Sequence, residues 1–108
     1  MRKFIRVHNG HRPIAVSTEM LRLVETYECV EEFSECVTEI GIRFTYADNS
    51  VVDVNFKDPK TIETLEEEAE GEGIDAEDVD NYVLKRIRNI HIHQYYEVIG
   101  VLTHLEEK

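Results

Sequence analysis

The chain has 108 residues, 42% of them apolar and 32% charged, which is enough to bury one hydrophobic core. Its formal net charge of −11 disfavours general binding of nucleic acids or anionic membranes, because like charges repel. No apolar run has the length of a membrane span, and Arg6, Asn9 and Arg12 interrupt the stretch that a signal peptide would need. We therefore expect a single acidic α+β domain over residues 1–108 and a cytoplasmic location.

The first predicted element is a β-hairpin. Residues 3–8 alternate loosely between apolar and polar types, and Asn9 and Gly10 together are typical of a turn. Residues 13–17 can pair back as a second strand, because a proline is tolerated at the first position of a strand.

Residues 18–27 fit both a helix and a strand. Four residues have helical spacing: Met20, Leu23, Val24 and Tyr27. One face of a strand would instead carry Leu21, Leu23, Glu25 and Tyr27. We favour a short helical turn that ends near Tyr27.

Residues 28–38 predict an amphipathic helix. Apolar side chains recur at steps of three and four: Cys29, Val30, Phe33, Cys36 and Val37. Acidic side chains form a stripe on the opposite side: Glu28, Glu32, Glu35 and Glu39. On such a helix the two cysteines lie roughly 10 Å apart along the axis, which is too far for a disulfide. We expect both to be buried as small hydrophobic residues.

Residues 40–57 predict a second β-hairpin, the strongest element in the sequence. Apolar and mixed positions alternate on both sides of residues 47–50, whose Asp and Asn suit a turn. Because only one face is apolar, we expect a small antiparallel sheet of three to five strands around this hairpin. Acidic amphipathic helices should pack on one face of it.

Two helices are expected after this hairpin. Asp58 is a suitable N-cap with a proline behind it, and Gly71 or Gly73 can end the first helix. Asp75 is the expected cap of the second helix, which continues to about residue 90. Residues 91–105 fit either a strand or a helix.

The negative charge is concentrated in the middle of the chain, where ten of the eighteen residues from Glu63 to Asp80 are acidic. A solvated surface is one interpretation of such a run. The other is a pair of helical faces that present carboxylates in rows, roughly 5–6 Å apart, to a basic partner. On this second interpretation the partner-binding residues are Glu28, Glu32, Glu35, Glu63, Glu66, Glu67 and Glu70.

The sequence contains few residues that could carry chemistry. On a strand, His91 and His93 would point the same way and could hold a divalent metal with a third ligand, but no third ligand is identifiable. There is no P-loop, no dinucleotide-binding glycine pattern and no recognisable catalytic motif. We therefore expect no enzymatic activity, no cofactor and no metal site.

Two resemblances can be stated. The order of strand, Asn9-Gly10 turn, second strand, apolar-acidic stretch and hairpin ending in Val52-Asp53-Val54 resembles the small flagellar FlbD-type domain. A Glu-rich insertion and a missing hairpin glycine depart from that pattern, so its function is not carried over. In size, acidity and lack of motifs the chain is also similar to phage-encoded anti-restriction and anti-CRISPR inhibitors, which block nucleic-acid-binding enzymes.

Two functions follow as hypotheses. The first is a small acidic module that docks on a basic, nucleic-acid-handling protein and inhibits or regulates it, as a nucleic-acid mimic would. The alternative is a homo-oligomeric structural or assembly protein, a homodimer in which strand edges or residues 95–105 form the interface.

Overall fold

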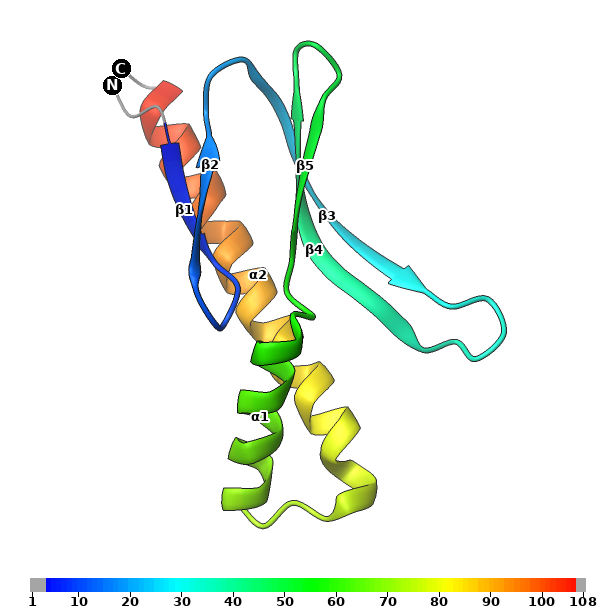
Figure 1. The fold of residues 1–108 in the computed structure, drawn as a ribbon. Helices are drawn as coiled ribbons and strands as arrows, with labels where there is room; N and C mark the ends of the chain where they lie inside the picture. The colour runs from blue at the N-terminus through cyan, green and yellow to red at the C-terminus, as the bar shows by residue number, and fades with distance from the viewer. Residues whose placement is uncertain (1–3, 107–108) are drawn as a thin grey trace.

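The computed structural model describes residues 4–106 and confirms the α+β class, with two antiparallel sheets and two α-helices (Figure 1). Strands β1 (Phe4–His8) and β2 (Pro13–Ser17) form the predicted N-terminal hairpin. The buried side chain of Asn9 fixes its turn by accepting hydrogen bonds from two backbone N–H groups, both at 3.0 Å. The buried Thr61 hydroxyl donates to the Asn9 carbonyl at 3.2 Å, which attaches the turn to the first helix.

The second sheet has the strand order β3 (Leu21–Val30), β4 (Val37–Tyr46) and β5 (Val51–Asn55), all antiparallel. The predicted central hairpin is thus confirmed as β4 and β5. One face of this hairpin packs into the hydrophobic core together with side chains of the helices. The hairpin residues on this face are Ile40, Ile42, Phe44, Tyr46 and Val54. The opposite face is polar and carries an ion pair between Arg43 and Asp53, with Nε and Oδ1 2.8 Å apart.

The helical turn expected at residues 18–27 is wrong, because most of this segment belongs to β3. The residues with helical spacing do not share one face of the strand: Val24 packs against the core, whereas Met20 and Leu23 are exposed. A β-bulge lies between Leu21 and Leu23. Leu21 pairs with β4 before the bulge and Val24 pairs with it afterwards, and both pack against the core. The extra residue places Leu21 and Val24 on the core face three positions apart, an interval that a helix also produces.

The helix expected at residues 28–38 is also wrong. Val30 at the end of β3 pairs with Val37 at the start of β4, and residues 31–36 form the turn between them. Glu35 adopts a left-handed conformation in this turn, with a φ of 57°. We call residues 28–39 the arm; Figure 1 shows that it projects away from the rest of the molecule.

The two cysteines are not in the core, contrary to expectation. Cys29 is partly exposed on β3, where it pairs with Glu39, and Cys36 is exposed in the turn of the arm. Both are free thiols. The seven-residue spacing that suggested a buried helical stripe arises because the two residues lie on opposite sides of a turn.

Helix α1 (Pro59–Gly71) begins and ends where the sequence predicts. The Asp58 carboxylate caps it by accepting a hydrogen bond from the Lys60 N–H at 2.9 Å. After a short 3-10 turn at Ala76–Asp78, α2 (Val79–Glu106) continues as one helix of 28 residues. Residues 91–105 therefore take the helical alternative.

The two helices form a helical hairpin. Asp75 precedes the 3-10 turn as predicted, but its side chain makes no capping hydrogen bond. Figure 1 shows α1 beside the first half of α2, and β1 and β2 in front of the second half. Within residues 4–106, neither helix combines the length and the hydropathy that a membrane span requires.

His91 connects α2 to the sheet. Its side chain is only 9% exposed, and its Nε2 lies 2.8 Å from the Gly41 carbonyl oxygen. The ring also packs edge-on against Phe56, with ring centroids 5.4 Å apart. Because a carbonyl can only accept, Nε2 carries a proton, and burial lowers the pKa of the His91 imidazole below its usual value.

We expect this histidine to make the folded state less stable as the pH falls through about 6.5. In the unfolded chain His91 takes up a proton near this pH, whereas in the folded protein it does so only at lower pH. Acid therefore favours unfolding. The nearby Glu28 carboxylate opposes this effect but does not cancel it, because burial is the larger influence on the pKa of His91. Urea unfolding between about pH 7.5 and pH 5 should show a smaller loss of stability in His91→Gln than in the wild type. Equal pH dependence in the two proteins would contradict this assignment.

Candidate functional site

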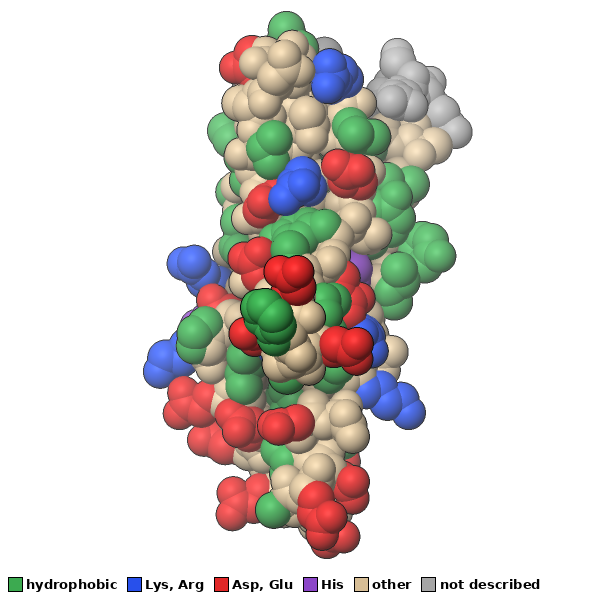
Figure 2. Space-filling model, turned by 90° about the vertical axis from the view of Figure 1, so that its right-hand side faces the viewer, with side chains coloured by type: hydrophobic (Ala, Val, Ile, Leu, Met, Phe, Trp, Pro, Cys, Tyr) green, Lys and Arg blue, Asp and Glu red, His purple; other side chains and the backbone are tan. Residues whose placement is uncertain are grey.

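Four of the glutamates predicted to bind a partner lie on one exposed side of α1: Glu63, Glu66, Glu67 and Glu70. The other side of this helix buries Thr61, Leu65 and Ala69. Figure 2 shows that acidic side chains gather at the lower end of the molecule, where the connection between α1 and α2 lies in Figure 1. The acidic surface predicted for this part of the chain is therefore present on a helix.

Two further predicted residues, Glu32 and Glu35, lie in the turn of the arm and not on a helix. The turn is ordered by its own hydrogen bonds, including one of 2.8 Å from the Ser34 hydroxyl to the Glu31 carboxylate. Between the acids, the Phe33 side chain is 92% exposed. The tip of the arm thus presents an aromatic ring surrounded by negative charge.

The remaining predicted residue, Glu28, has a partner within the chain. Its carboxylate on β3 forms an ion pair with the Arg88 guanidinium on α2. A second pair joins the two helices, with Arg86 Nε and Glu68 Oε2 3.3 Å apart. Glu28 therefore holds the arm to α2, and its carboxylate already has a cationic partner within the chain.

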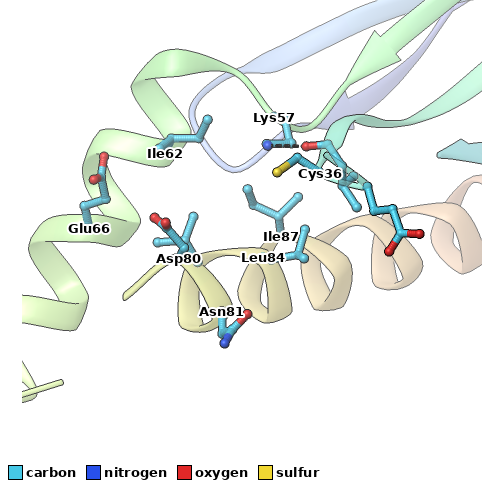
Figure 3. A pocket seen from close by; sticks show the side chains of 11 residues that line it. Cys36, Lys57, Ile62, Glu66, Asp80, Asn81, Leu84 and Ile87 are labelled. Atoms are coloured by element: carbon cyan, nitrogen blue, oxygen red, sulfur yellow. Dashed lines mark hydrogen bonds between the residues drawn. The ribbon is translucent and has the colours of Figure 1, made fainter. Parts of the chain in front are cut away.

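A cleft of 440 Å³ opens between the arm and the two helices. Its apolar lining comes from β4, α1 and α2: Val37, Ile62, Val83, Leu84 and Ile87. Figure 3 shows Ile62 on α1 and Ile87 on α2 pointing into the space between the elements. Three carboxylates line the same cleft, Glu35 from the arm, Glu66 from α1 and Asp80 from α2.

The cleft also contains one basic side chain, Lys57, in the loop between β5 and α1. Its ammonium group donates a hydrogen bond to the Val37 carbonyl at 2.6 Å (Figure 3). This bond ties the start of β4 to the loop, so the lysine positions the arm at the edge of the cleft. With three carboxylates and one ammonium, the charge of the lining is negative.

The strand that would have let His91 and His93 point the same way is not present, because both lie on α2. On helix α2, His91 and His93 project about 200° apart around the axis, since each residue turns by about 100°. His91 binds the Gly41 carbonyl, whereas the exposed His93 lies 3.1 Å from the Glu97 carboxylate. Among the described residues, no group of three or more His, Cys, Asp or Glu side chains is placed to hold a metal ion.

Sequence reasoning missed two residues of this region, Asp80 and Phe33. Asp80 is the last residue of the acidic run that begins at Glu63. It lies four residues before Leu84, so on a helix the two side chains are neighbours, and this spacing indicates that Asp80 lies beside the apolar stripe of the second helix. The helical spacing of residues 28–38 predicts a buried Phe33, whereas the structure exposes it. The local signal for its exposure was the run of small and acidic residues around it, which suits a turn.

Comparison with known proteins finds no matching family model and no significantly similar curated protein or solved structure. The resemblances noted in the sequence therefore stay predictions.

Proposed function

We propose that this chain is a small acidic binding module that takes up a basic, amphipathic segment of a protein partner in the cleft between the arm and the helices. One observation carries the proposal: Glu35, Glu66 and Asp80 come from three separate parts of the fold and line the same cleft as a set of apolar side chains. Carboxylates that are far apart in the sequence are thereby available to one bound segment.

The chemistry of the cleft favours an amphipathic segment over a uniformly basic one. Apolar side chains of such a segment can lie on Ile62 and Ile87, while its Lys or Arg side chains reach the carboxylates at the edge. The net charge of −11 also accelerates the approach of a basic partner over distances of about one Debye length.

A nucleic-acid-handling protein is the partner class that we propose. Such proteins carry basic surfaces that accept regularly spaced phosphates. Neighbouring glutamates on the exposed side of α1 are about 5–6 Å apart, a spacing comparable to that of phosphates along a strand. A partner occupied by this surface would be unable to bind nucleic acid there, so the module would inhibit or regulate it.

The binding proposal is tested with a synthetic amphipathic peptide that has Leu on one face and Lys and Arg on the other. The double variant Glu66→Gln/Asp80→Asn should bind the labelled peptide about three- to tenfold more weakly, because exposed charge contacts contribute up to about 1 kcal/mol each. Fluorescence anisotropy at low and high salt measures the effect, and the difference between the proteins should shrink as salt is added.

A matched control separates the cleft from the overall charge. Glu19→Gln/Glu25→Gln changes the net charge by the same amount at residues that do not line the cleft. We expect this variant to bind nearly as well as the wild type. Equal weakening in the two variants, or no peptide binding by the wild type, would refute the cleft as the binding site.

The partner class requires a second experiment. A pull-down from the native host with tagged protein, eluted on a salt gradient, should release a nucleic-acid-binding protein at moderate salt. Added duplex DNA should compete with the module for that protein. A captured partner that binds DNA and the module at the same time would contradict the inhibitory role.

A further inference from the structure

The C-terminal half of α2 carries an apolar stripe that the core does not use. Ile92 is 43% exposed and Tyr96 is 67% exposed, and Ile99 lies on the same side of the helix without packing against the core. In contrast, Tyr95 and Val98, which we expected in an interface, pack into the core. The exposed stripe therefore shares Tyr96 and Ile99 with the predicted segment 95–105, but begins earlier, at Ile92.

This stripe is also the part of the chain with the least charge. Among the residues from Asn89 to Thr103, Glu97 is the single Asp, Glu, Lys or Arg. Its carboxylate lies 3.1 Å from His93 in the same helix. One turn before Ile92, Arg88 is already paired with Glu28. A charged partner would therefore find little to pair with along the stripe, whereas a second copy of this acidic chain could approach it without strong local repulsion.

The spacing of the stripe fits an antiparallel copy of itself. Ile92 lies four residues before Tyr96, and Ile99 lies three residues after it. If two α2 helices pack antiparallel with both Tyr96 rings near the two-fold axis, Ile92 of each copy meets Ile99 of the other. Gly100 gives room beside the rings, because no atom lies within 4 Å of where its Cβ would be.

We propose that two copies of this chain associate through the Ile92–Tyr96–Ile99 stripe of α2 in an antiparallel arrangement. The cleft uses Asp80, Leu84 and Ile87 from the first half of the same helix. The dimer would therefore leave both clefts open and offer two binding sites. This association is independent of what the clefts bind.

The oligomeric state in solution tests the proposal. Light scattering after gel filtration should give a mass that rises with concentration toward that of two chains and persists in about 1 M salt, since apolar contacts are not screened. Tyr96→Glu should remain monomeric over the same range with an unchanged circular dichroism spectrum, because this side chain lies at the surface. A wild-type protein that stays monomeric throughout would overturn the proposal.

Cysteine cross-linking tests the arrangement itself. In a Cys29→Ser/Cys36→Ser background, Tyr96→Cys should form an intermolecular disulfide under mild oxidation. Facing Cα atoms of helices packed about 8–10 Å apart come within disulfide reach. Glu25→Cys, in the middle of edge strand β3, serves as the matched position and should remain reduced. A dimer that cross-links through Glu25→Cys and not through Tyr96→Cys would overturn the proposal in favour of a strand-edge interface.

Discussion

Replacing Phe56 with alanine is expected to lower the free energy of unfolding by about 3–5 kcal/mol, because a fully buried phenylalanine leaves a large cavity. Its side chain has no exposed surface, and its ring packs against His91 of α2. Its backbone N–H also donates to the Ile40 carbonyl at 2.7 Å, at the end of the central hairpin. Urea unfolding followed by circular dichroism measures the loss.

Phe33→Ala provides the matched control, since it removes the same atoms from an exposed position. We expect a change within about 0.5 kcal/mol for this variant. The pair of variants also distinguishes the two interpretations of residues 28–38, because a helix would bury Phe33 and the arm does not. Similar losses of stability in the two variants would contradict the fold described here.

Gly41→Ala is expected to destabilise the protein by about 1–3 kcal/mol, the usual cost of forcing atoms into a packed site. A Cβ at this position would overlap the Val54 carbonyl oxygen of the adjacent strand and the Tyr27 hydroxyl across the sheet. The Tyr27 ring also lies against the Arg43 guanidinium, at 4.9 Å from Cζ to the ring centroid. Chemical denaturation measures the effect, which should exceed any gain from the higher strand propensity of alanine.

The Tyr27 hydroxyl reports on the same site, because it lies where the new Cβ would be. Burial and the nearby Asp53 carboxylate raise the pKa of Tyr27 to about 12. If the alanine displaces the ring, the pKa should fall toward the ordinary value of about 10, as seen in the ultraviolet absorbance of the phenolate. Gly71→Ala, at an open position at the end of α1, should be neutral or stabilising by up to about 1 kcal/mol. A stable Gly41→Ala protein with an unchanged Tyr27 pKa would show that the sheet accommodates the extra carbon.

The elements that the sequence predicts well are those with a local chemical signal. The central hairpin has strict alternation and a turn of Asp and Asn, and α1 has both a capping aspartate and a terminal glycine. In β3 the local signal is misleading. Apolar residues recur there at intervals of three and four, as in a helix, but they are divided between the core side of the strand, its exposed side and the turn after Val30.

The candidate site could be predicted only in part. The glutamates on α1 follow from helical periodicity, because their spacing alone places them on one side. The cleft depends on Lys57 binding Val37 and on Arg88 binding Glu28, and these contacts join residues that are far apart in the chain. No pattern within a short window shows that the arm lies opposite the helical hairpin.

We propose above that the cleft between the arm and the helices binds a basic, amphipathic segment. The most direct test is a titration of ¹⁵N-labelled protein with the amphipathic Lys/Arg peptide, followed by amide chemical shifts. We expect the largest changes at cleft residues from the arm, α1 and α2, such as Glu35, Ile62 and Leu84. Changes confined to the β1–β2 hairpin or to residues 92–103, or no changes at all, would contradict it.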